Sequence, residues 1–79
     1  MTKTELMKTY NMDTDDQNEN NFAGLYDILI EYEIATEKEL ELVCSINGNN
    51  MGTLLSVLYV RAGLRSIEQL FSEIADENE

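Results

Sequence analysis

From residue 22 onward, apolar side chains recur at intervals of three and four residues, with charged or amide side chains between them. This spacing places the apolar residues on one face of an α-helix. It predicts four helices, over about Phe22–Ile30, Glu37–Ile46, Met51–Ala62 and Ile67–Ala75. The sequence therefore indicates an all-α fold, a small bundle of about four short helices.

Residues that favour helix starts and stops stand at the expected boundaries. The asparagine pair at 20–21 is placed to cap the first helix. Thr36 to Glu39 and Ser66 to Gln69 fit the capping box, in which two residues three positions apart bind each other's backbone N–H groups. Asn47 to Asn50 and Gly63 are typical helix stops, because they tolerate positive φ.

The apolar stripes predict which sides of the helices are buried. The third helix has little polar face, so we expect it in the middle of the bundle. Arg61 is near the end of this helix and Arg65 follows it, and we expect both to pair with carboxylates of the acidic half. The buried stripe of the second helix is predicted to contain Leu40, Val43, Cys44 and Ile46.

Residues 1–21 have a different composition. From Thr9 to Asn21 the chain contains five Asn or Gln residues, four acids and almost no apolar residue to bury. This predicts a flexible acidic N-terminal arm over 1–21, ahead of a helical domain over 22–79. The segment around Leu6 has the spacing of a single helical turn that docks through its apolar side chains, and the sequence leaves that alternative open.

The charge is strongly negative. The 79 residues contain sixteen acids, five bases and no histidine, for a formal charge of −11. Ten of the acids and only Lys38 among the bases lie between Asp13 and Glu41. Such a surface repels nucleic acid and anionic lipid and attracts proteins that bind nucleic acid. We therefore expect no direct binding to nucleic acid or to a membrane.

Few residues offer catalytic or metal-binding chemistry. Cys44 is the only cysteine, no histidine is present to activate it, and it lies on an apolar stripe. Asp16 to Asp27 matches a calcium-binding EF-hand loop poorly, since Asn21 and Asp27 replace the required glycine and glutamate. We expect a non-enzymatic protein of the cytoplasm, without cofactor or metal.

The acids themselves are the candidate site. Carboxylates four residues apart on a helix lie roughly 6 Å from each other, close to the spacing of successive phosphates in a nucleic-acid strand. The alternative is a solvated helix face that only keeps the protein in solution. The predicted partner-binding residues are Asp27, Glu31, Glu33, Glu37 and Glu41.

The stretches Ile34 to Val43, Ile46 to Asn50 and Leu58 to Gln69 resemble short acidic proteins carried by phages and mobile elements of Gram-positive bacteria. The resemblance implies a protein that acts in a bacterial host cell, where such proteins often inhibit host defence, as anti-CRISPR and anti-restriction proteins do. It implies no particular inhibitory residue.

Two main hypotheses follow, and a third, a phage regulator that acts on a host transcription or replication protein, is not separated from the first by the sequence. In the first, the protein inhibits a host-defence nuclease, a type II CRISPR nuclease or a restriction enzyme, by docking an acidic helical face in its basic nucleic-acid groove. In the second, it is a small helical protein-interaction module that acts on a host protein through exposed apolar residues of the third and fourth helices. Such a module is a possible homodimer, because a core this small is often completed by a second copy.

Overall fold

The computed structural model describes residues 2–75, and all regular elements in that range are helices. The predicted all-α fold is confirmed, with one α-helix more than the four expected. The elements are α1 (Lys3–Tyr10), the short 3-10 helix η1 (Glu19–Asn21), α2 (Phe22–Glu31), α3 (Glu37–Asn47), α4 (Met51–Ala62) and α5 (Ile67–Ile74).

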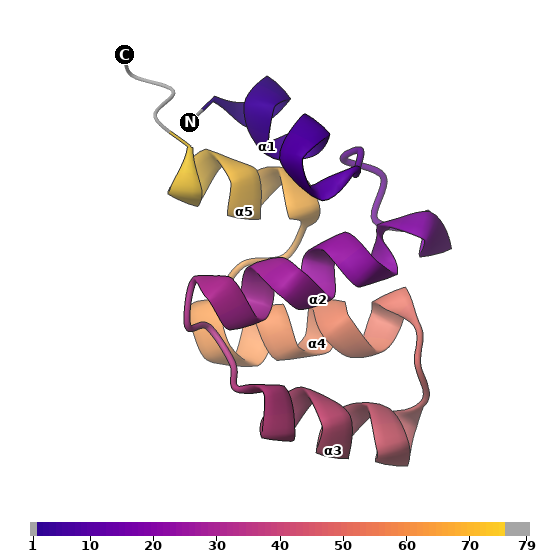
Figure 1. The fold of residues 1–79 in the computed structure, drawn as a ribbon. Helices are drawn as coiled ribbons and strands as arrows, with labels where there is room; N and C mark the ends of the chain where they lie inside the picture. The colour runs from indigo at the N-terminus through magenta and orange to yellow at the C-terminus, as the bar shows by residue number, and fades with distance from the viewer. Residues whose placement is uncertain (1, 76–79) are drawn as a thin grey trace.

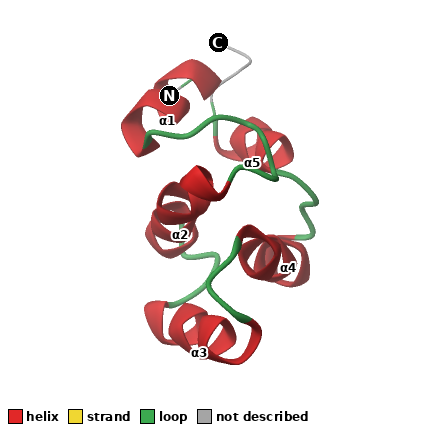
Figure 2. Ribbon diagram, turned by 90° about the vertical axis from the view of Figure 1, so that its right-hand side faces the viewer, coloured by secondary structure: helices red, strands yellow, loops and turns green. Residues whose placement is uncertain are grey.

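The helices stack in three layers (Figure 1). The pair α2 and α4 forms the middle layer, with α1 and α5 on one side of it and α3 on the other, and Figure 2 shows the same order from a second direction. Helix α4 packs on both α2 and α3, whereas α1 packs on α2 and α5. The predicted central position of the third helix is therefore confirmed.

Most of the predicted helix boundaries are confirmed by their capping bonds. Thr36 and Glu39 form the expected reciprocal capping box. Gly63 ends α4 in the left-handed conformation, with φ of 72°. At the start of α5 the capping box is incomplete, because the Gln69 side chain accepts a hydrogen bond from the Arg65 N–H instead of from Ser66.

The prediction that Asn20 or Asn21 caps α2 with its side chain is wrong. Asn21 occupies the N-cap position but makes no side-chain capping bond, because its amide is turned toward residues 13–15. Asn18 instead caps η1 by accepting a hydrogen bond from the Asn20 N–H. The turn of 3-10 helix thus leads the chain into α2.

The core is one connected cluster with contributions from every α-helix. The predicted burial of Ile46 is wrong: its side chain is 72% exposed, because α3 is the outermost layer and only one of its sides is covered. The buried apolar residues are Leu6, Met12, Leu25, Ile28, Leu29, Ala35, Leu40, Cys44, Met51, Leu54, Val57, Leu58, Ile67, Leu70 and Phe71.

The flexible acidic arm over 1–21 is not confirmed. Residues 3–10 form α1, and the docked alternative through Leu6 is the one observed, since Leu6 is fully buried. A capping box formed by Thr2 and Glu5 stabilises the start of this helix, and Asn11 ends it with a left-handed φ of 54°. The sequence therefore contains the capping-box pattern Thr-x-x-Glu at residues 2–5, which marks the start of this helix.

A glycine permits the close approach of this N-terminal segment to α2. A Cβ atom on Gly24 would lie 2.7 Å from the Tyr10 carbonyl oxygen and would also collide with the Met12 side chain. Met12 is buried at this contact. Because Gly24 has no side chain, the end of α1 and the following loop pack directly on the backbone of α2 at this residue.

Candidate protein-interaction surface

Residues 13–21 form an ordered acidic loop around one buried amide. Asn21 is 1% exposed, and its Nδ2 donates to the Asp13 carboxylate at 2.8 Å and to the Asp15 carbonyl at 2.9 Å. Its Oδ1 accepts a hydrogen bond from the Asp13 N–H at 3.0 Å. The bond that the Asn21 amide donates to the Asp13 carboxylate, together with those from the Asp15 N–H and the Asn18 side chain, lowers the pKa of the Asp13 carboxyl.

Two further acids of this loop bind the starts of distant helices. Asp16 accepts a hydrogen bond from the backbone N–H of Ile67, the first residue of α5, at 2.8 Å. Glu19 accepts from the N–H of Met51, the first residue of α4, at 3.2 Å. A carboxylate is favoured there, because helix N-termini present free N–H groups and a positive dipole end.

The same hydrogen bonds argue against residues 16–27 being a calcium-binding EF-hand loop. Oxygens of Asp16 and Glu19 point at backbone N–H groups of α5 and α4, and Asn21 is turned into the loop. Within residues 2–75 no group of three or more Asp, Glu, Cys or His side chains is arranged to hold a metal ion. These acids act in the structure as links between segments.

The five predicted site residues are all exposed. Asp27 and Glu31 lie one turn apart on α2, and Glu37 and Glu41 lie one turn apart on α3. Glu33 is in the link between these helices, with a left-handed φ of 58°. We call these five residues the acidic face.

Two tyrosines, Tyr26 and Tyr10, lie close to carboxylates of the acidic face that belong to other helices. The pKa of Tyr26 on α2 is raised, first by partial burial and then by the negative charges of Glu41 and Glu37 on α3. Glu31 accepts a hydrogen bond from the Tyr10 hydroxyl at 2.5 Å, and burial and this bond raise the pKa of Tyr10. The structure thus brings Glu37 and Glu41 beside α2 and engages Glu31 with α1.

The two arginines behave differently. Arg61 forms an ion pair with Glu39 at the start of α3, as expected. Arg65 lies over the ring of Tyr59, 5.5 Å from its centroid, and has no carboxylate partner within residues 2–75. The predicted internal pairing is therefore confirmed for Arg61 and wrong for Arg65, whose guanidinium lies over an aromatic ring.

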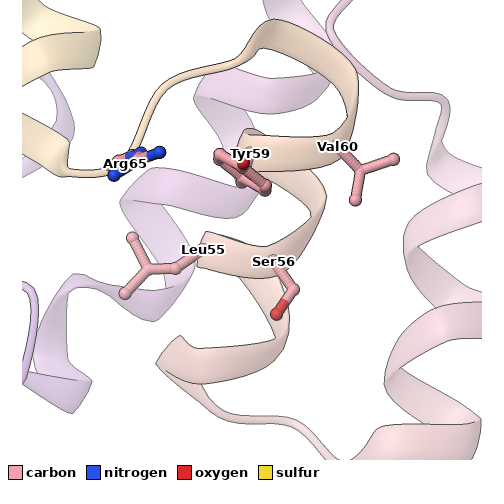
Figure 3. Close-up of a pocket in the computed structure, with 5 residues that line it drawn as sticks. All are labelled: Leu55, Ser56, Tyr59, Val60 and Arg65. Atoms are coloured by element: carbon pink, nitrogen blue, oxygen red, sulfur yellow. The ribbon is translucent and has the colours of Figure 1, made fainter.

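A second surface, on α3 and α4, is apolar. Two shallow hollows adjoin on α4 and share Ser56 and Val60. One of them is lined further by Leu55, Tyr59 and Arg65, whose side chains lie along α4 and the loop after it (Figure 3). The other extends to Val43 of α3. Leu42, before Val43, and Ile46, after it, are exposed on the same helix but line neither hollow. We call Leu42, Val43, Ile46, Leu55, Tyr59 and Val60 the apolar face.

These two surfaces present exposed carboxylates and exposed apolar side chains. Cys44 is buried in the core, and the sequence contains no histidine. The longest helix described, α4, has 12 residues, and no helix in residues 2–75 has the length and apolar character needed to cross a bilayer. Comparisons with protein-family models, with curated protein sequences and with solved structures give no match.

Proposed function

We propose that this protein is a non-enzymatic binder that docks its acidic face on the basic, nucleic-acid-binding surface of another protein. In its specific form, the partner is a host-defence nuclease of the bacterial cell, a type II CRISPR nuclease or a restriction enzyme, and docking keeps the nucleic acid out. The resemblance to phage and mobile-element proteins supports this specific form.

The observation that carries the proposal is the geometry of the acidic face. Asp27 with Glu31, and Glu37 with Glu41, are exposed carboxylates four residues apart on helices that are anchored in the core. Arg61 is paired with Glu39 and lines a hollow with Glu33 and Glu37, and Lys38 is exposed on α3. The five carboxylates and Lys38 together keep a net charge of −5 + 1 = −4. Rows of carboxylates at roughly 6 Å spacing on rigid helices present charge in the way a phosphate backbone does.

The test uses a purified type II CRISPR nuclease loaded with guide RNA and, in parallel, a restriction enzyme. We expect the protein to inhibit DNA cleavage and to bind less tightly as NaCl rises from about 50 to about 500 mM, because exposed ion pairs are screened. Glu37→Lys with Glu41→Lys should abolish inhibition. Affinity that persists in about 1 M NaCl would contradict the proposal, since charge could not then supply the binding energy.

The matched control reverses two charges elsewhere. Glu68 and Glu73 are exposed on α5, and Glu68, like Glu37, lies in the first turn of its helix. Glu68→Lys with Glu73→Lys therefore changes net charge and helix-end electrostatics by similar amounts. We expect it to keep most of the inhibition, and equal loss in both variants would assign the effect to net charge alone.

A further inference from the structure

The link between α3 and α4 contains an asparagine that is followed directly by a glycine. These residues are Asn47, the last residue of α3, and Gly48, and every other asparagine of the sequence precedes a residue that carries a side chain. The backbone nitrogen that follows an asparagine can attack the carbonyl carbon of the asparagine side chain. A Cβ atom beside that nitrogen hinders the attack. Gly48 has no Cβ, so Asn47 is the asparagine with the least hindered neighbour.

The attack converts the asparagine amide into an acid in two steps. The Gly48 nitrogen gives its proton to a base in the solvent and bonds to Cγ of Asn47, and the side-chain nitrogen takes up a proton and leaves as ammonia. The product is a five-membered succinimide ring. Water then opens the ring at one of its two carbonyl carbons, which yields either aspartate or isoaspartate. In isoaspartate the main chain continues through the side-chain carbon. The reaction therefore consumes one water and releases one ammonia.

The side chain of Asn47 is free to take part in this reaction. It is exposed, and within residues 2–75 no hydrogen bond or ion pair holds it. Helix α3 is an outer layer of the molecule, and the turn that follows Asn47 lies at the edge (Figure 1). Asn49 in the same turn is also exposed, but it is followed by Asn50 and not by glycine. Asn49 is therefore an internal comparison for the effect of the glycine.

The attacking nitrogen, in contrast, is held on both sides. The Gly48 N–H donates a hydrogen bond to the Cys44 carbonyl at 2.8 Å, which closes the last turn of α3. The Gly48 carbonyl accepts a hydrogen bond at 2.8 Å from Oγ1 of Thr53, a residue of α4 that is 6% exposed. The nitrogen must leave Cys44 before it can reach the Asn47 side chain. The reaction therefore requires local opening of the end of α3, and helix ends open at a lower free energy than the core.

We propose that Asn47 is a site of spontaneous deamidation, and that the bond from Thr53 to Gly48 slows the reaction by keeping the turn closed. The product carries a new carboxylate, so the formal charge changes from −11 to −11 − 1 = −12. A negative charge on the last residue of α3 opposes the helix dipole. Isoaspartate also lengthens the main chain just before the turn that positions Asn50, the N-cap of α4. Deamidation should therefore loosen the link between α3 and α4.

The test is incubation of the full chain at mildly alkaline pH, folded and in urea, with deamidation at each asparagine followed by peptide mapping and mass spectrometry. In urea, Asn47 should react faster than Asn49. In the folded chain, Asn47 should react more slowly than in urea. Thr53→Ala removes the hydroxyl that binds Gly48. Loss of one hydrogen bond makes opening about five times more frequent, so the rate at Asn47 in the folded variant should rise about fivefold.

Two controls separate the effect of the hydroxyl from general destabilisation. Thr53→Ser keeps a hydroxyl and should react at the rate of the unmodified chain, and in urea all three chains should react equally. Hydrogen exchange at the Gly48 amide measures the opening directly, and it should rise by the same factor as deamidation in Thr53→Ala. This relation holds even where the variant is partly unfolded, as circular dichroism would show.

Three results would overturn the proposal. A rate at Asn47 no higher than at Asn49 in urea would show that the glycine does not select the site. Equal rates at Asn47 in the folded chain and in urea would show that the fold gives no protection. Equal rates in the folded unmodified chain and in folded Thr53→Ala would show that the bond to Gly48 does not control the opening.

Discussion

The acids of residues 13–19 and the acids of α2 and α3 are similar in number and type but differ in what they contact. In the loop, Asp13 binds the amide of Asn21, and Asp16 and Glu19 bind the first N–H groups of α5 and α4. On the acidic face, Glu31 alone has a hydrogen bond to another helix, from Tyr10. The first group joins segments of the fold, whereas within residues 2–75 the carboxylates of Asp27, Glu33, Glu37 and Glu41 make no hydrogen bond or ion pair with another helix.

This difference changes what the charge of the chain implies. A count of carboxylates treats Glu19 and Glu41 alike, although Glu19 holds the start of α4 and Glu41 lies on an outer helix surface. Negative charge near a helix N-terminus is stabilising, while like charges four residues apart repel each other. Carboxylates that do not stabilise the fold, such as those of the acidic face, are therefore better candidates for a function than those of the loop.

The largest expected effect comes from removing the amide that organises the loop. Asn21→Ala deletes hydrogen bonds to Asp13 and Asp15 and leaves a buried site without its polar partner. We expect a loss of about 2–4 kcal/mol in the free energy of unfolding, measured with urea. The control Asn20→Ala, at an exposed neighbour, should lose less than about 1 kcal/mol. Equal stability of the two variants would show that the loop does not contribute to the fold.

Removal of the two helix-binding carboxylates should have an intermediate effect. Asp16→Ala frees the Ile67 N–H and Glu19→Ala frees the Met51 N–H. We expect each to lower the free energy of unfolding by about 1 kcal/mol, in line with the loss of an N-terminal cap. Hydrogen exchange should increase at the starts of α5 and α4 respectively. Asp27→Ala on the acidic face provides the comparison, with an expected change below about 0.5 kcal/mol.

Local sequence patterns were sufficient for α2 to α5 and insufficient for the loop. The bounds of α4 follow from its apolar run and from Gly63, and they are confirmed. The bonds from Glu19 to Met51 and from Asp16 to Ile67 span 32 and 51 residues. No periodicity or capping motif relates residues so far apart, and the composition of the loop alone predicts flexibility.

Local sequence patterns also predict only part of the acidic face and of the apolar face. Glu37 is exposed in the first turn of α3, and Glu41 is exposed about 100° around the helix from the buried Leu40. The engagement of Glu31 by Tyr10, and the exposure of Ile46, depend on which helix covers which side. The docking of α1 had a local signal in Thr2 and Glu5, but its stability comes from the contacts of Leu6 with the rest of the core.

The loop should also make stability depend on pH at the acidic end. The pKa of Asp13 in the folded protein lies below its ordinary value of 3.8, so the unfolded chain binds the proton more readily. Its contribution is fully present above about pH 4 and is lost as pH falls through the lower folded value. The pH dependence of urea unfolding should show this loss, and Asn21→Ala should weaken it. A pH dependence unchanged by Asn21→Ala would exclude Asp13 as its source.

The smallest expected effect on stability belongs to Glu37→Gln with Glu41→Gln. Removing Glu37 loses a favourable charge at the start of α3, and removing the pair relieves repulsion one turn apart, so the free energy of unfolding should change by less than about 0.5 kcal/mol. The pKa of Tyr26 should nevertheless fall, because Glu41 and Glu37 help to raise it. NMR titration of the tyrosine rings measures this change, and burial should keep the value above the ordinary 10.0. Destabilisation as large as that of Asp16→Ala would mean that the acidic face stabilises the fold as the loop of residues 13–19 does. That result would contradict the proposal that the acidic face is a binding surface.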